Sequence, residues 1–123
     1  MPDIDGHHKG LVIGQTHEIA HGNSRKFLLT CGDKEIDGFV VNFNGKFYAY
    51  VNQCCHIPMP LDWRENEFFT RDKRYLLCPT HGAAYEPNTG LCIDGPCPGE
   101  YLEPIPVTVK QGQIIVYCPP EWD

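Results

Sequence analysis

The sequence has no apolar run near the roughly 20 residues that a membrane-spanning helix needs. Its first ten residues, MPDIDGHHKG, also lack the apolar core of a secretory signal. Positive charge is scarce, because ten Lys and Arg stand against sixteen Asp and Glu and leave a net charge of −6. Nucleic acids and anionic membranes both attract basic surfaces, so this charge argues against either as the main partner. We therefore expect a cytoplasmic protein whose partners are proteins with basic surfaces.

Long helices also have little room, because 12 Gly and 11 Pro interrupt the 123 residues. The apolar runs between them are short, and several alternate with polar residues as half-buried strands do. A chain of this length forms one domain, which we expect to span residues 1–123. The expected strand regions are Gly10–Ala20, Arg25–Cys31, Ile36–Phe43, Lys46–Val51, Tyr75–Leu77, Leu91–Ile93, Val107–Lys110 and Gln113–Tyr117.

Two short turns join neighbouring strand regions. Asn44-Gly45 is the strongest local signal for a hairpin, and Gln111-Gly112 is a second candidate. The segment from about 52 to 99 is different, since it holds five of the seven cysteines and six of the eleven prolines. The sequence thus predicts an all-β fold, a small antiparallel sandwich or barrel, with a loop subdomain inserted at about 52–99.

Two motifs in this middle segment each combine one cysteine with one histidine. Cys54 and His56 have the spacing Cys-x-His, and Cys78 and His81 have the spacing Cys-x-x-His. Twenty-one residues separate the motifs, so two loop tips could meet and offer two thiolates and two imidazoles. Such a set can hold zinc, although zinc fingers usually take both cysteines from one loop. It also suits a binuclear cluster with one iron on two thiolates and the other on two imidazoles.

The paired motifs resemble the signature of Rieske [2Fe–2S] proteins, and the neighbouring residues agree. Gly82 follows the second histidine, Tyr85 stands at the family's aromatic position, and Gly95-Pro96 resembles a third loop that covers the cluster. The resemblance spans about residues 10–117 and implies one Rieske-type [2Fe–2S] cluster per chain. The residues it implies at the cluster are Cys54 and Cys78 on the inner iron, His56 and His81 on the outer iron, and Tyr85 and Pro96 beside it.

Three positions depart from the pattern of respiratory-complex Rieske proteins. Met59 and Thr80 stand where those proteins have a further pair of cysteines, so the chain resembles the simpler ferredoxin type. Ala83 stands where they have a hydroxyl donor. Because hydrogen bonds to cluster sulfur raise the reduction potential, we expect a value in the lower part of the roughly −150 to +300 mV span of Rieske centres.

The resemblance implies an electron carrier and not an enzyme. Its expected role is the ferredoxin component that passes one electron from a flavin reductase to an oxygenase. The sequence shows no second domain and no further two-histidine, one-carboxylate site that an oxygenase would need. The alternatives are a cluster-bearing regulatory or accessory subunit, such as one like the small subunit of nitrite reductase, and a zinc-held structural module.

The remaining cysteines have simpler interpretations. A cytoplasmic protein keeps its thiols reduced, so Cys31, Cys92 and Cys118 are interpreted as buried core thiols. Cys55 is expected to fill space between two ligands, and Cys97 is assigned mainly to packing, with a redox role as the alternative.

Aromatic residues and histidines outside the motifs are also expected to be structural. Trp63, Phe68 and Phe69 are expected to anchor a long loop to the body of the protein, the alternative being a partner patch. His7, His8, His17 and His21 lack metal-ligand spacing and are expected to be solvated or to cap backbone groups.

Overall fold

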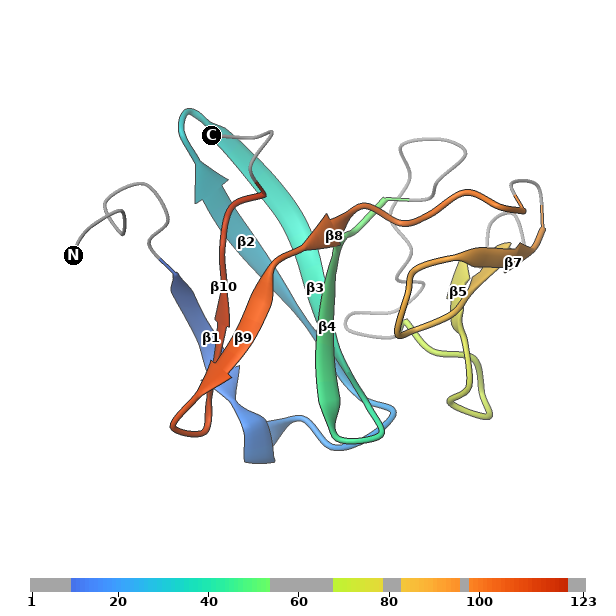
Figure 1. Ribbon diagram of the computed structural model, residues 1–123, viewed down its shortest axis with the longest axis horizontal. Coiled ribbons are helices and arrows are strands. Elements are labelled where there is room, and N and C mark those ends of the chain that lie inside the picture. Colours follow the sequence, from blue (N-terminus) through green and yellow to red (C-terminus); the bar gives the residue numbers. More distant parts are fainter. Residues whose placement is uncertain (1–9, 54–67, 79–82, 96–97, 120–123) are drawn as a thin grey trace.

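The computed structural model of the chain describes residues 10–53, 68–78, 83–95 and 98–119 (Figure 1). These ranges consist mainly of short strands, with a single turn of 3-10 helix, η2 (Thr16–Glu18), and no α-helix. Every strand pair among them is antiparallel. The predicted all-β antiparallel fold is therefore confirmed. No helix in the described part of the chain is long and apolar enough to cross a membrane.

The strands form three sheets. In Figure 1 the first two sheets occupy the left and centre of the molecule, and the third lies apart on the right. The first has the order β1 (Leu11–Gln15), β10 (Gln113–Val116), β9 (Val107–Lys110). The second has the order β2 (Ser24–Cys31), β3 (Lys34–Phe43), β4 (Lys46–Val51), β8 (Pro104–Ile105). The third has the order β5 (Leu76–Cys78), β6 (Ala83–Tyr85), β7 (Cys92–Asp94).

Both predicted hairpins form where the sequence places them. Asn44 and Gly45 join β3 to β4 with φ angles of 58° and 85°, and Gln111 and Gly112 join β9 to β10 with 52° and 77°. Two successive residues with positive φ match the right-handed twist of the flanking strands, which is why Asn-Gly favours this turn. The turns therefore fix the register of both strand pairs.

Two apolar cores lie on opposite faces of the second sheet. The barrel core, between the first two sheets, consists of Ile19, Phe27, Leu29, Cys31, Ile36, Val40, Ala49, Val51, Ile105, Ile114 and Val116. The module core, toward the third sheet, consists of Phe39, Val41, Tyr50, Phe68, Phe69, Leu76, Ala83, Tyr85, Cys92 and Leu102. Strands β3 and β4 contribute alternate residues to the two cores, because successive side chains of a strand point to opposite faces.

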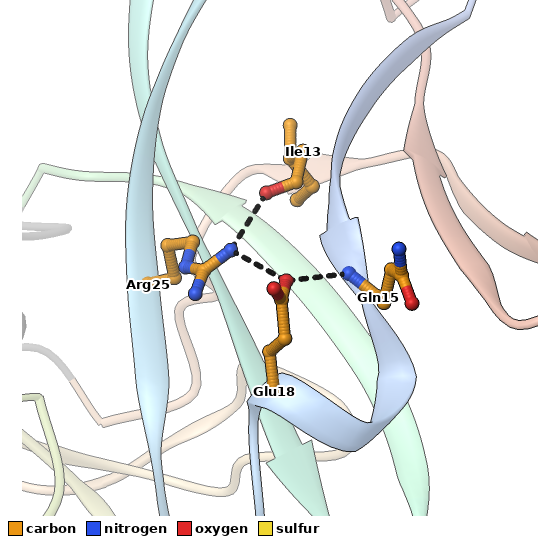
Figure 2. Close-up of polar contacts among 4 residues, drawn as sticks. All are labelled: Ile13, Gln15, Glu18 and Arg25. Carbon is orange, nitrogen blue, oxygen red and sulfur yellow. Dashed lines mark hydrogen bonds and ion pairs between the residues drawn. The ribbon is translucent and has the colours of Figure 1, made fainter.

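A polar contact joins the first two sheets at one end of the barrel. Arg25 in β2 donates from Nη1 to the carbonyl of Ile13 in β1 at 3.1 Å and to Oε1 of Glu18 at 3.2 Å (Figure 2). The amide of Gln15 donates to the same carboxylate oxygen at 2.9 Å. The Gln15 amide and then the Arg25 guanidinium lower the pKa of Glu18. Both donors favour the charged carboxylate, so the contact holds the chain between β1 and β2 in place.

The structure corrects the interpretation of two cysteines. Cys31, at the end of β2, forms a disulfide with Cys118, which follows β10, and their Cα atoms lie 5.8 Å apart. The expectation that both are core thiols is wrong for this pair, because folding brings residues 87 positions apart into bonding distance. The disulfide therefore joins the second sheet to the segment that follows β10 of the first sheet. Cys92 is a buried core thiol, as predicted.

Two strands were not predicted, and one boundary differs from the sequence prediction by more than two residues. The region Gly10–Ala20 is a strand only to Gln15, after which the chain turns through η2. Strands β6 and β8 were not predicted, since their alanines and proline are residue types depleted in strands.

Candidate metal centre

The second Cys-His motif begins on a tight hairpin of the third sheet. Cys78 is the last residue of β5 and pairs with Ala83, the first residue of β6. Leu76 pairs with Tyr85 two positions further along, so the hairpin register is set on both strands. Only residues 79–82 connect the two strands. His81 belongs to that connection and lies outside the described residues.

The first motif follows directly on β4. The amide of Asn52 donates to the carbonyl of Asp37 at 2.7 Å, and the amide of Gln53 donates to the carbonyl of Val51 at 2.9 Å. The side chains of Asn52 and Asp37 also meet, with Nδ2 and Oδ2 3.4 Å apart. These contacts fix the point at which the chain leaves the sheet toward Cys54. Cys54, like the rest of the first motif through His56, lies outside the described residues.

The proline loop leaves the end of β7. Gly95 has a φ of 103°, a conformation that favours glycine, and its amide donates to Oδ1 of Asp94 at 2.9 Å. Pro96 and Cys97 lie outside the described residues. Because β6 pairs with both neighbours in antiparallel register, β5 and β7 end at the same edge of the third sheet. The second motif and the proline loop therefore leave from one edge.

The two described positions beside the proposed cluster are fully buried. Tyr85 and Ala83 both have no exposed surface and belong to the module core. The low reduction potential was expected because Ala83 carries no hydroxyl. The burial of these two side chains does not test that value, which stays a prediction.

The described residues do not themselves form a metal site. No group of three or more His, Cys, Asp and Glu that could hold a metal occurs within the ranges 10–53, 68–78, 83–95 and 98–119. The donors that fit a cluster are the thiolates and imidazoles of the two motifs, since thiolates select iron–sulfur clusters and imidazole also suits iron. The end of β5 at Cys78 is the described position at which the second motif begins, and Gln53 is the described residue that precedes the first.

Aromatic residues join the third sheet to the second. Phe68 stacks on Phe39 with ring centroids 4.0 Å apart and planes 7° from parallel. Phe68 is 1% exposed and Phe69 is 6% exposed, so both anchor the chain to the body as predicted. Trp63 lies outside the described residues. His21 accepts a hydrogen bond at Nδ1 from the Asn44 amide at 2.9 Å, a backbone-capping role that was also predicted.

A second tie between the sheets was not predicted from sequence. The Tyr50 hydroxyl in β4 donates to the Pro87 carbonyl at 2.7 Å. Gly90 lies against the same ring, where an added Cβ would meet Cε1 of Tyr50 at 2.8 Å. Burial, the largest cause, raises the pKa of Tyr50 well above its usual value of 10.0. The alternating tyrosines at 48 and 50 predict a strand, but they do not indicate which group the Tyr50 hydroxyl would bind.

Comparison with known proteins identifies the family. The Rieske [2Fe-2S] domain family matches residues 9–116, nearly the whole chain. The chain therefore belongs to the Rieske [2Fe–2S] domain family, and its cofactor is a Rieske-type [2Fe–2S] cluster. A search of curated proteins gave no match.

Solved structures agree with this assignment. A chain in the complex of reduced oxygenase and oxidized ferredoxin in carbazole 1,9a-dioxygenase is 26% identical, with a TM-score of 0.68 over 86% of this chain and 99% of that one. The ferredoxin of Sphingomonas yanoikuyae B1 is 21% identical, with a TM-score of 0.66 over 90% of this chain and 100% of that one. A chain of the reduced complex between oxygenase and ferredoxin in carbazole 1,9a-dioxygenase is 20% identical, with a TM-score of 0.73, and this chain spans 28% of its length. Family and fold together support electron transfer as the function.

Proposed function

We propose that this chain is a one-electron carrier, the ferredoxin component between a flavin reductase and an oxygenase, and not itself an enzyme. When bound, a Rieske-type cluster accepts and gives up a single electron. The observation that carries the proposal is the alignment with a chain of an oxygenase–ferredoxin complex over 99% of that chain's length. The proposal treats residues 1–123 as one domain, with a cluster-binding subdomain at about 52–99.

The ligand assignment is part of the proposal. Cys54 and Cys78 would hold the inner iron, and His56 and His81 would hold the outer iron. Support comes from the register of β5 and β6, which sets Cys78 and Ala83 opposite each other at the base of the connection that carries His81. Tyr85, buried in the same hairpin, and Pro96, beyond the end of β7, would line the cluster.

A location in the cytoplasm also belongs to this proposal. The Cys31–Cys118 disulfide is the observation against it, since disulfides are rare in cytosolic proteins of most organisms.

Replacing one proposed ligand tests the site and the function together. We expect the wild-type protein to contain iron and inorganic sulfide in equal amounts, to show a Rieske-type EPR spectrum, and to pass electrons from NADH and a flavin reductase to cytochrome c. His81→Ala should lose the EPR signal and lower the electron-transfer rate at least about 100-fold, because the outer iron loses half its protein ligands.

His17→Ala is the matched control, since His17 is an exposed histidine outside both motifs. We expect this variant to behave as the wild type. If His81→Ala keeps the iron and its spectrum, the ligand assignment is wrong. If the wild type holds its cluster but binds a partner in only one oxidation state and passes no electrons, the carrier function is wrong.

A further inference from the structure

An apolar strip is exposed at β7 and at the isolated bridge that precedes it. It consists of Leu91, Ile93 and Tyr101, and we call it the β7 strip. Tyr101 is 60% exposed and Ile93 is 41% exposed, while Leu91 is partly buried. Large apolar side chains that gather on one exposed face are unusual unless something covers them.

Backbone hydrogen bonds hold two residues of the strip, Leu91 and Tyr101, on one face. Leu91 and Tyr101 form an antiparallel bridge, flanked by bonds from the Cys92 amide to the Glu100 carbonyl at 2.7 Å and from the Leu102 amide to the Gly90 carbonyl at 2.8 Å. In such a pair the two opposing side chains lie close together on the same side. Ile93 lies between Cys92 and Asp94, where the register against β6 shifts by one residue, and its side chain is exposed next to this pair in the sequence.

The side chains on the other side of the same backbone are buried in the module core. Cys92 and Leu102 are each 1% exposed and belong to the module core. The strip therefore cannot turn inward without removing buried side chains from that core. It is a preformed surface, which saves a binding partner the entropy cost of ordering it.

Two carboxylates adjoin the strip in the sequence. Residues 75–109 contain no Lys or Arg, and they contain four carboxylates, Glu86, Asp94, Glu100 and Glu103. Asp94 directly follows Ile93, and Glu100 directly precedes Tyr101. An apolar centre with acidic neighbours is complementary to an apolar centre with basic neighbours.

The strip also adjoins the edge of the third sheet at which the second motif and the proline loop begin. β7 ends at Asp94, which pairs with Ala84 of β6, and the neighbouring Ala83 pairs with Cys78 at the end of β5. A protein seated on the strip would therefore lie near the strand ends, Cys78 and Ala83, that flank the second motif's connection. Weak redox complexes need only a small interface, so three apolar residues with a charged rim are enough to guide one.

We propose that the β7 strip is the docking surface for the redox partner, a protein whose own docking face has an apolar centre ringed by Lys and Arg. This inference rests on the proposed electron-carrier function. The apolar residues hold the complex together, and the carboxylates steer its approach.

The test uses mitochondrial cytochrome c, a basic haem protein, as the acceptor. Reduced cluster-bearing protein is mixed with it in a stopped-flow instrument, and the second-order rate constant is measured at ionic strengths of about 20 and 500 mM. Tyr101→Ser and Ile93→Ser should each lower the rate constant about five-fold, since central apolar contacts carry most of the energy of an interface.

Leu28→Ser is the matched apolar control. Leu28 is 62% exposed on β2, nearly the same as Tyr101, and it lies outside the third sheet. Its rate constant should equal that of the wild type. Midpoint potentials are measured for all variants and should be unchanged, because a docking residue alters the encounter and not the driving force.

A pair of charge reversals tests the acidic rim. Glu100→Lys should lower the rate constant about three-fold at low ionic strength, and the difference should vanish at high ionic strength. Glu35→Lys changes the net charge equally on the exposed side of the β2–β3 hairpin, which lies away from β7 in Figure 1, and should have a smaller effect.

The outcomes separate the two proposals. If wild-type protein with its cluster transfers no electrons, the carrier function fails and the strip fails with it. If the wild type transfers electrons while Tyr101→Ser, Ile93→Ser and Leu28→Ser all behave alike, the strip alone is overturned. Should Tyr101→Ser lose its cluster, Ile93→Ser and Glu100→Lys decide the result.

Discussion

Tyr50 shows how one hydroxyl can connect two parts of the molecule. Its ring is 3% exposed and belongs to the module core, and its hydroxyl reaches the Pro87 carbonyl at 2.7 Å. Both partners are buried, so loss of the hydroxyl leaves a carbonyl without this donor. A buried neutral hydroxyl also resists ionisation, so the stability that Tyr50 contributes depends on pH.

We predict that Tyr50→Phe lowers the free energy of unfolding by about 1–2 kcal/mol at neutral pH. The pKa of Tyr50 is raised in the folded protein, so its contribution is complete below the unfolded pKa of about 10 and is lost as pH rises above it. Urea unfolding between about pH 9 and 11 should therefore show a decline in stability that is shallower in Tyr50→Phe.

Tyr48→Phe is the control for this prediction, because Tyr48 lies on the same strand two residues earlier. It should unfold as the wild type does across the same pH range. Equal slopes for wild type and Tyr50→Phe would contradict the assigned role of the hydroxyl.

At the scale of residues, the sequence was informative where chemistry is local. Spacing within a few residues predicts the paired Cys-His motifs and, with them, the cluster. The contacts of Tyr50 with Pro87 and of Phe68 with Phe39 could not be predicted, because each joins residues far apart in the sequence. Aromatic side chains offer many possible partners, and only the folded backbone selects one.

At the scale of elements, the Cys31–Cys118 disulfide fastens the end of β2 to the segment after β10. The bond closes a loop of 87 residues, for which the chain-entropy estimate is about 4–5 kcal/mol of stabilisation. Much of the barrel lies within that loop. Its loss should therefore be measurable in equilibrium unfolding.

We predict that Cys31→Ser, Cys118→Ser and the double variant all lose stability by nearly the same amount, about 4 kcal/mol, in urea unfolding. Either single change breaks the same bond, so the second adds little. Losses that simply add would show that the two thiols are not joined. Alkylation of thiols in intact cells then reports whether the bond exists in the compartment where the protein works.

Elements were predictable where turn chemistry and alternation agree. Asn44-Gly45 fixed the expectation of a hairpin, and β3 and β4 form around it. β6 was missed because alanine is depleted in strands, although its pairing with β5 places Ala83 opposite Cys78, where the second motif begins. The disulfide was missed because sequence spacing says nothing about pairing across 87 residues.

At the scale of the whole molecule, the two cores differ in the length of the strands that contribute residues to them. The barrel core rests on β2 and β3, with eight and ten residues. The module core rests partly on β5, β6 and β7, with three residues each. Short strands bury little, so the third sheet depends more on whatever its loops bind.

We predict that removing the cluster loosens the third sheet first. Amide hydrogen exchange in β5, β6 and β7 should become about ten-fold faster or more, while β2 and β3 keep their protection. The comparison uses the same protein before and after removal of iron. Equal acceleration in both parts would mean that the cluster supports the entire fold and not one sheet.

Strand β3 contributes residues to both cores, and this limits which sequence changes it tolerates. Phe39 and Val41 serve the module core, while Ile36 and Val40 serve the barrel core. One extra amino acid inserted in its middle would send every following side chain to the opposite interior, and both halves would lose their packing at once. We expect related proteins to vary this segment by exchange of one side chain for another and to preserve its length.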